Sequence, residues 1–168
     1  MRINRVPLIK SVQRVTFSEA AATGLHTYTQ TIARVLIDRT LVMIINMQAG
    51  YYASASLFWS YFAGADLLDP STVRLNVNAQ AVGTPAGVIA RVEIIELMAR
   101  PRSLQALAGN SDTSQTISTV DPTKAIIVPA YQMATLAGES NNPTLEATRV
   151  LWTAATDPAY RWQVAQFN

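Results

Sequence analysis

Hydrophobic and polar residues alternate along much of the chain, and this period of two predicts β-strands. Residues 72–78 show it most clearly, because valine or leucine occupies every second position with polar residues between them. The aliphatic run at 41–45 has the length of a buried strand. Strands are predicted at residues 11–17, 29–35, 41–45, 72–78, 88–97 and 125–128. The pattern therefore predicts an all-β fold.

The segments between these strands are less uniform. Glycine and proline in residues 83–87 predict a turn, which would join the strands at 72–78 and 88–97 into a hairpin. Residues 52–66 fit a strand, an excursion or a short helix, and we interpret them as a long connection. Residues 145–155 have a composition compatible with a helix, but the internal comparison that follows favours a strand.

An internal repeat runs through the chain. Residues 30–43 align with residues 115–128 without a gap, so that Gln-Thr-Ile, a valine, a basic residue and an aliphatic run coincide. Shorter matches in the same order are 11–13 with 103–105, 73–75 with 148–150, and 93–97 with 163–167. We predict two tandem antiparallel β-sandwich units related by internal duplication, residues 1–102 and 103–168. Two unrelated stretches of β sequence are the alternative.

Composition narrows the chemistry that such a chain can perform. Its 168 residues include no cysteine, which excludes disulfide bonds, thiolate metal sites and a cysteine nucleophile. The single histidine, His26, lies at a predicted loop edge without an acidic neighbour, and we assign it no catalytic role. Asp66 and Asp69 are too sparse for a calcium loop, and we interpret them as turn or helix-cap residues.

The acidic pair Glu93 and Glu96 does not suggest catalysis either. The two residues flank two isoleucines of a predicted strand, so their side chains are expected on opposite faces. The inward one would need a basic partner such as Arg91 or Arg74. We therefore predict no catalytic residue, no metal ligand and no cofactor, and we expect that the protein is not an enzyme.

Charge is scarce and unevenly divided. Charged residues make up 14% of the chain, against about 25% in typical domains. Residues 1–102 hold ten Lys or Arg and six Asp or Glu, whereas residues 103–168 hold three and five. Eleven of the thirteen basic residues are arginine, which suits partly dehydrated contacts, so we interpret the surface as one that other subunits cover. The net charge of +2 argues against nucleic acid binding, and no apolar run has the length of a membrane helix.

Aromatic side chains gather in residues 51–62. We favour a subunit interface or a hydrophobic plug at the end of a sandwich, and the alternative is a platform on which a glycan stacks. Trp152 and Trp162 lie on predicted strands of the second unit and are expected in its core. The aromatic residues assigned to the interface are Tyr51, Tyr52, Phe58, Trp59, Tyr61 and Phe62.

The N-terminal segment carries a second candidate interface. Its basic residues Arg2, Arg5, Lys10 and Arg14 form either a solvated arm or an arm that fastens onto a neighbouring subunit. Polar residues interrupt the segment, so no signal peptide of the usual length is visible.

One succession of motifs resembles a known family. Residues 103–168 contain Ser-Leu-Gln, then Thr-Ile-Ser-Thr-Val-Asp-Pro-Thr-Lys and an aliphatic strand, then a strand bearing Arg149, and a terminal Gln-Val-Ala-Gln-Phe strand. This succession resembles a small β-sandwich module common in structural proteins of tailed bacteriophages. Residues 9–98 are similar in outline, but they have Leu-Ile-Asp-Arg at 36–39 and a long aromatic-rich insertion.

The resemblance implies a non-enzymatic virion protein. Such a protein would attach as a homo-oligomer to the capsid as decoration, or to the neck, tail or fibre base. Its partners would be other virion proteins, and it would be made in the host cytoplasm and end in the virion. A carbohydrate-binding module that contacts a host cell-surface glycan is the alternative from a different class.

Overall fold

The structure is a computed structural model of the chain. It describes residues 8–19, 24–49, 60–80, 87–108, 114–129, 131–134, 143–151 and 161–168. For residues 49, 60–62, 79, 80, 129 and 131–134 it describes the backbone only.

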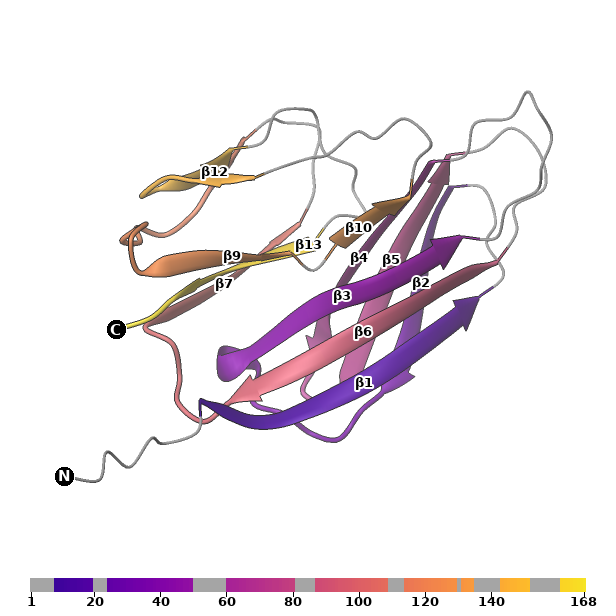
Figure 1. Ribbon diagram of the computed structural model, residues 1–168, viewed down its shortest axis with the longest axis horizontal. Helices are drawn as coiled ribbons and strands as arrows, with labels where there is room; N and C mark the ends of the chain where they lie inside the picture. Colours follow the sequence, from indigo (N-terminus) through magenta and orange to yellow (C-terminus); the bar gives the residue numbers. More distant parts are fainter. Residues whose placement is uncertain are drawn as a thin grey trace.

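The described residues form antiparallel strands and one short 3-10 helix, η1 (Figure 1), which confirms the all-β prediction. The elements of the first half are β1 (Ile9–Glu19), β2 (Gly24–Thr31), η1 (Ile37–Arg39), β3 (Thr40–Ala49), β4 (Ser60–Asp69), β5 (Thr72–Gln80) and β6 (Val88–Leu97). Those of the second half are β7 (Ser103–Ala108), β8 (Ser114–Thr116), β9 (Ala125–Pro129), β10 (Tyr131–Ala134), β11 (Thr144–Leu145), β12 (Arg149–Leu151) and β13 (Arg161–Gln166).

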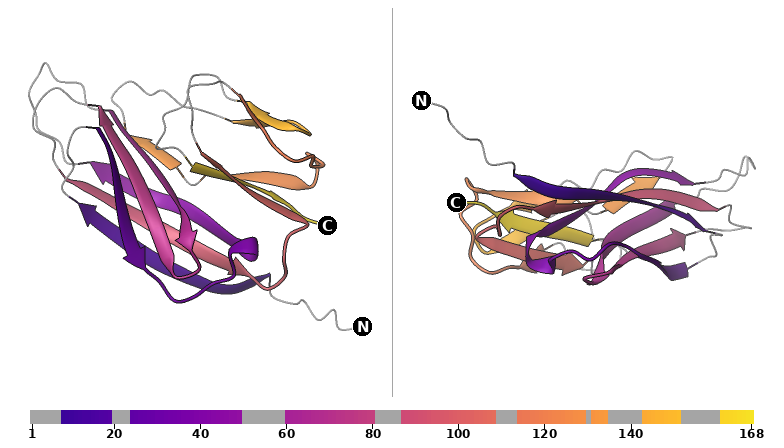
Figure 2. Two further views of the ribbon diagram at one scale, coloured as in Figure 1. Left: turned by 180° about the vertical axis from the view of Figure 1, so that it is seen from behind. Right: turned by 90° about the horizontal axis from the view of Figure 1, so that it is seen from below.

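The first half is a sandwich of two sheets (Figure 2). One sheet has the strand order β1-β6-β3, and the other has the order β10-β4-β5-β2. Every second side chain on the facing strands points into a shared core, where Phe17, Val42, Leu75 and Ile94 are fully buried. Each such side chain stabilises the fold by about 1.5–3 kcal/mol.

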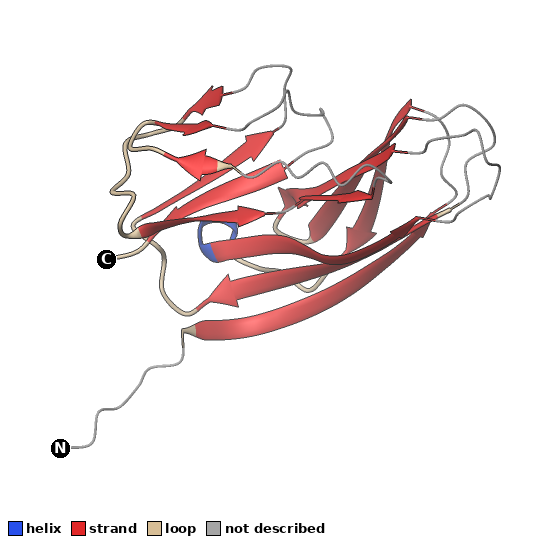
Figure 3. Cartoon of the chain, turned by 45° about the horizontal axis from the view of Figure 1, so that its top comes forward, coloured by secondary structure: helices blue, strands red, loops and turns tan. Residues whose placement is uncertain are grey.

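The second half is a smaller sandwich, and Figure 3 shows that it too consists of strands. Its sheets have the orders β7-β13-β9 and β11-β12-β8. Trp162 is 1% exposed and packs with Leu107, Val150 and Val164, as expected for a core tryptophan. Trp152 lies outside the described residues.

The two halves share one strand order and one register. In each half the first strand pairs with the last, and the last pairs with the third, so β1, β6 and β3 correspond to β7, β13 and β9. Thr40 pairs with Glu96 in the first half, and Ala125 pairs with Gln166 at the corresponding place in the second. These are the matches that the sequence alignment makes at both places.

A glutamine side chain makes the same pair of hydrogen bonds in both halves. Gln13 Nε2 donates to the Ala33 carbonyl, and the Ala33 N–H donates to Gln13 Oε1, both at 2.8 Å. Gln105 forms the same pair with Ser118, at 3.0 and 2.6 Å. The amide thus takes the place of a peptide group beside the segment that crosses between sheets. Such agreement is what duplication predicts, and the duplication itself stays a prediction.

The strand pairing shifts one part of the predicted alignment by two residues. Val73 pairs with Gln30, and Val150 pairs with Gln115. Val73 therefore corresponds to Val150, whereas the sequence alignment matches it to Thr148. A shift of two leaves inward and outward positions unchanged, so the hydrophobic pattern could not detect it.

The predicted hairpin between residues 72–78 and 88–97 is wrong. β5 lies between β4 and β2 in one sheet, whereas β6 lies between β1 and β3 in the other. Both strands bury one face in the same core, and alternation looks alike whether two strands pair or face each other across a sandwich. Residues 83–86 of the predicted turn lie outside the described residues.

The strand predicted at 29–35 begins earlier and ends at Thr31. Ile32 and Val35 follow it without regular strand structure, yet both are buried in the core. Their N–H groups donate to carbonyls of the β4–β5 turn, at 2.8 and 2.9 Å. β-branched residues therefore marked core positions here rather than a continuous strand.

Two further segments differ from their predictions. The connection predicted at 52–66 is wrong for residues 60–66, which belong to β4, and residues 52–59 lie outside the described residues. The strand predicted at 145–155 is divided, because β11 ends at Leu145 and β12 begins at Arg149. Residues 152–155 lie outside the described residues.

Glu96 is the buried carboxylate that the strand pattern predicts. Its side chain is 3% exposed, and it accepts hydrogen bonds from Lys10 Nζ at 3.0 Å, Ser11 Oγ at 3.4 Å and the Leu36 N–H at 3.3 Å. Burial alone would raise the pKa of Glu96, but the bonds from Lys10 and Leu36 outweigh it and hold the pKa below its usual value. The partner is thus a lysine and not the expected arginine.

We expect Glu96→Gln to lower the free energy of unfolding near neutral pH by about 1–3 kcal/mol, because its three donors lose a charged acceptor. The pKa of Glu96 is lower in the folded than in the unfolded protein, so its contribution is present above the unfolded pKa. That contribution is lost as the pH falls through the folded pKa. Urea unfolding across this range should therefore show a weaker pH dependence for the variant.

Glu146→Gln is the matched control, since the Glu146 side chain is 42% exposed and its ion pair with Arg149 lies on the surface. The control should change stability by less than about 1 kcal/mol. An equal loss in both variants would contradict the role given to Glu96.

Candidate functional site

The two halves meet along the edges of β3 and β4 (Figure 1). β10 follows β9 in the chain but pairs with β4 of the first half, with Gln132 opposite Ala63 and Met133 opposite Phe62. This pairing ends at Gly64. Among the described strands, none pairs with this edge of β4 from Ala65 onward.

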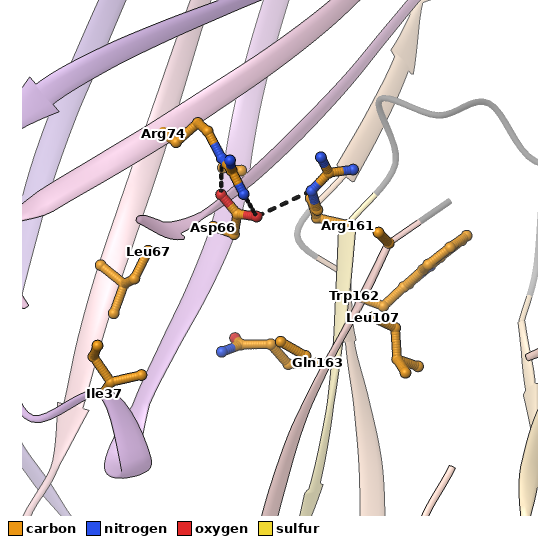
Figure 4. A pocket seen from close by; sticks show the side chains of 11 residues that line it. Ile37, Asp66, Leu67, Arg74, Leu107, Arg161, Trp162 and Gln163 are labelled. Atoms are coloured by element: carbon orange, nitrogen blue, oxygen red, sulfur yellow. Dashed lines mark hydrogen bonds and ion pairs between the residues drawn. The ribbon is translucent and has the colours of Figure 1, made fainter. Parts of the chain in front are cut away.

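A cleft of about 210 Å³ lies beside this unpaired part of β4. Figure 4 shows Asp66 and Arg74 from the first half on one side of it, and Arg161 and Gln163 from the second half on the other. The large apolar residues that line it are Ile37, Leu67, Leu107 and Trp162.

Asp66 joins the two halves by ion pairs at this cleft. Arg74 Nε donates to Oδ1 at 2.8 Å, and Arg74 Nη2 donates to Oδ2 at 2.7 Å. Arg161 Nε, from the first residue of β13, donates to the same Oδ2 at 3.0 Å. The side chains of Arg161 and Asp66 are 15% and 21% exposed, so water screens this pair less than a surface pair. The Asp66 hydrogen bonds also raise the pKa of Arg74, which keeps it charged.

Gln163 binds the open edge of β3 with its side-chain amide. The Val42 N–H donates to Gln163 Oε1 at 2.8 Å, and Gln163 Nε2 donates to the Thr40 carbonyl at 3.0 Å. Two backbone groups of an edge strand are thereby satisfied without a further strand.

An apolar cluster completes the contact between the halves. It consists of Leu41, Leu97, Val128 and Ala165, which are buried, with Met43, Ile95, Leu104 and Phe167 packed against them. Several members are corresponding positions of the two halves, such as Leu97 and Phe167, which each follow the buried polar residue of the last strand. The β1-β6-β3 sheet of the first half and the β7-β13-β9 sheet of the second thus each bury part of their outer face in this contact.

The polar residues of the cleft form ion pairs that join the two halves. The two oxygens of Asp66 accept three hydrogen bonds from two guanidinium groups, so its carboxylate is fully engaged in holding the halves together. The described residues that line the cleft include no serine, threonine, histidine or lysine. Asp66 is therefore neither the turn residue nor the cap residue that we predicted.

Two basic residues of the predicted N-terminal interface are ion-paired within the chain. Lys10, whose side chain is 50% exposed, binds the buried Glu96. Arg14 is 75% exposed, and its Nε donates to Glu93 Oε1 at 2.6 Å. Glu93 and Glu96 thus lie on opposite faces, as predicted, and the inward one is Glu96. Arg2 and Arg5 lie outside the described residues.

The predicted aromatic interface is described only in part. Tyr61 and Phe62 belong to β4, where their backbones pair with Ala134 and Met133 of β10. Tyr51, Tyr52, Phe58 and Trp59 lie outside the described residues.

Other candidate residues lie away from the cleft. His26 lies within β2 and not at a loop edge, and its ring stacks on Tyr28 with centroids 6.4 Å apart. Asp69 is a turn residue as predicted, because it accepts a hydrogen bond from the Ser71 N–H at 2.7 Å. Arg161 and Gln163 were missed, since alternation shows which face a residue occupies but not what lies opposite that face.

Comparisons with known proteins add no relative. The chain matches no family model, no curated protein and no solved structure. Among the described residues, no three His, Asp or Glu side chains come close enough to hold a metal ion. In the same part of the chain, no helix is long and apolar enough to cross a bilayer.

We expect Asp66→Asn to lower the free energy of unfolding by about 2 kcal/mol, because hydrogen bonds to a charged group contribute about 1.5–3 kcal/mol each. Arg161→Gln removes one of the same bonds, so the two substitutions should be non-additive by about 1 kcal/mol. Urea unfolding of the wild type, both single variants and the double variant measures this coupling.

The control cycle combines Glu146→Gln with Arg149→Gln, which removes an exposed pair within the second half. Its coupling should stay below about 0.5 kcal/mol. Additive effects at Asp66 and Arg161 would mean that their ion pair does not join the halves.

Proposed function

We propose that this protein is a non-enzymatic structural protein of a tailed-phage virion, which attaches as an oligomer to the capsid or to the neck or tail. The motif resemblance of residues 103–168 supports the class. The composition of the outer face of the β1-β6-β3 sheet is the observation that supports attachment through protein contacts.

This outer face presents aliphatic side chains beside arginines. Val12 and Ile89 are 43% and 38% exposed, and Ile45, at the register shift of β3, is 46% exposed. Arg14 and Arg91 are exposed on the same face, because they alternate with inward residues of β1 and β6. We call these five residues the outer patch. A mixture of aliphatic residues and arginine is typical of surfaces that another protein covers.

The outer patch continues toward the N-terminal arm. Leu8 and Ile9, at the start of β1, are 61% and 47% exposed. β1 is also an edge strand of its sheet. Arg2 and Arg5 precede this strand in the sequence, and we propose that they contact the same neighbour as the outer patch.

One end of the first sandwich supports a second contact. Glu19, Ala49 and Val88 lie side by side in one sheet, so the connections 20–23, 50–59 and 81–86 all join strands at this end. These three connections contain no charged residue, and 50–59 contains four of the aromatic residues assigned to the interface. Connections without charged residues suit a contact that excludes water.

Several acidic side chains of the body already serve its structure. Asp66, Glu93, Glu96 and Glu146 each accept a hydrogen bond from a basic side chain. A protein that acts through contacts requires such a fixed body, and many copies in a lattice can share weak contacts effectively.

Sedimentation of the purified protein tests the proposal. We expect the wild type to form oligomers, and Val12→Glu with Ile89→Glu to shift it to monomers by at least tenfold in dissociation constant, because two buried apolar contacts become charged. Leu25→Glu is the control, since Leu25 is 53% exposed on β2 of the opposite sheet.

Binding to phage particles is the second measurement. The outer-patch variant should lose particle binding and the Leu25 variant should keep it. A wild type that stays monomeric and does not bind particles would refute the proposal, as would equal losses in both variants.

A further inference from the structure

A polar pocket in the second half corresponds to a filled site in the first. It has a volume of about 380 Å³ and lies where the start of β7, the segment before β9 and the end of β13 meet. The residues that line it are Arg102, Ser103, Thr119, Val120, Asp121 and Gln166.

The corresponding site of the first half holds a carboxylate. Ser11 pairs with Glu96 as Ser103 pairs with Gln166, so Glu96 occupies the place of Gln166. Lys10, which precedes Ser11, then occupies the place of Arg102. The Glu96 carboxylate accepts hydrogen bonds from Lys10, from Ser11 and from the Leu36 N–H.

In the second half the donors persist, but the carboxylate does not. Arg102 supplies a guanidinium in place of the Lys10 ammonium, and Ser103 supplies the same hydroxyl as Ser11. Gln166 supplies a neutral amide in place of the Glu96 carboxylate. The donors that contact a carboxylate in the first half are thus in contact with none in the described part of the second half, where the Asp121 carboxylate lines the same pocket without an ion pair to Arg102.

Gln166 is the pocket residue that takes the place of Glu96. It is 4% exposed, and within the described part of the chain no residue forms a hydrogen bond with its amide. Among the described residues, none forms a hydrogen bond or an ion pair with the Arg102 guanidinium. An amide that lines a pocket and has no partner among the described residues can donate a hydrogen bond to a group bound there.

The remaining acid of the pocket is already bound. Asp121 Oδ1 accepts hydrogen bonds from the Thr123 hydroxyl at 2.7 Å and the Thr123 N–H at 3.0 Å. These bonds, with the charges of Lys124 and Arg102, hold the pKa of Asp121 below its usual value. Because its own chain already neutralises Asp121 in this way, Asp121 does not prevent Arg102 from also binding an anion in the pocket.

We propose that this pocket binds a carboxylate group supplied from outside the chain, which takes the place that Glu96 occupies in the first half. Arg102 holds it by charge-assisted hydrogen bonds, while Ser103 and Gln166 donate further bonds. The carboxylate belongs either to an acidic amino-acid side chain or to an acidic sugar. Because the pocket is open to water, affinity for the isolated group should be about millimolar.

Titration followed by two-dimensional amide NMR at constant ionic strength tests the proposal. The probes are acetate, the α-amide of N-acetylglutamate, glucuronate and, as a neutral isostere, acetamide. Saturable shifts of Ser103, Asp121 and Gln166 with the three carboxylates, and none with acetamide, are expected. Tenfold tighter binding of the glutamate probe assigns an acidic side chain, and tenfold tighter binding of glucuronate assigns an acidic sugar.

Three variants make the test specific. Arg102→Gln should weaken binding at least tenfold. Gln166→Glu should do the same, because it places a carboxylate of the chain in the pocket, and an unchanged near-UV circular dichroism spectrum shows that it folds. Arg34→Gln is the control, since Arg34 is exposed and lies in the first half. Equal shifts with acetamide, or unchanged binding by Arg102→Gln or Gln166→Glu, would overturn the proposal.

Discussion

Unpaired strand edges are the constraint on which this structure depends. A small sandwich exposes backbone N–H and C=O groups along its edges, and each must find a partner or stay in water. Here the second half completes two edges of the first: β10 pairs with β4, and the Gln163 amide binds Thr40 and Val42 of β3. The ion pair of Asp66 with Arg161 and the shared apolar cluster then hold the halves in one arrangement. The rigid body that a lattice protein would need follows from these contacts.

The two halves share a strand order but differ at a few positions. In the first half β3 stays paired with β6 to Ala49, whereas in the second half β9 pairs with β13 only to Pro129. Pro129 has no N–H to donate, and β10 beyond it joins the other half. Gln166 in place of Glu96 opens a pocket where the first half has an ion pair. The first difference allows β10 to pair with the other half, and the second gives a candidate binding site.

Sequence patterns predicted the strands and the repeat better than the contacts between them. Alternation placed Val73 in the core and put Glu93 and Glu96 on opposite faces, because burial on one face imposes a period of two. It could not show whether β5 and β6 pair or face each other, nor that Lys10 would reach Glu96. The cleft residues Asp66 and Arg161 are far apart in sequence, and no local pattern reports a contact between the two halves.

Native-state hydrogen exchange measures most directly whether the halves form one unit. If the contacts between the halves make them one cooperative unit, the amides of Val92 in β6 and Val164 in β13 should exchange through the same global opening. Their exchange free energies should then agree within about 1 kcal/mol and fall together in Gln163→Ala. A second half that opens several kcal/mol before the first, with the first unaffected, would contradict the account.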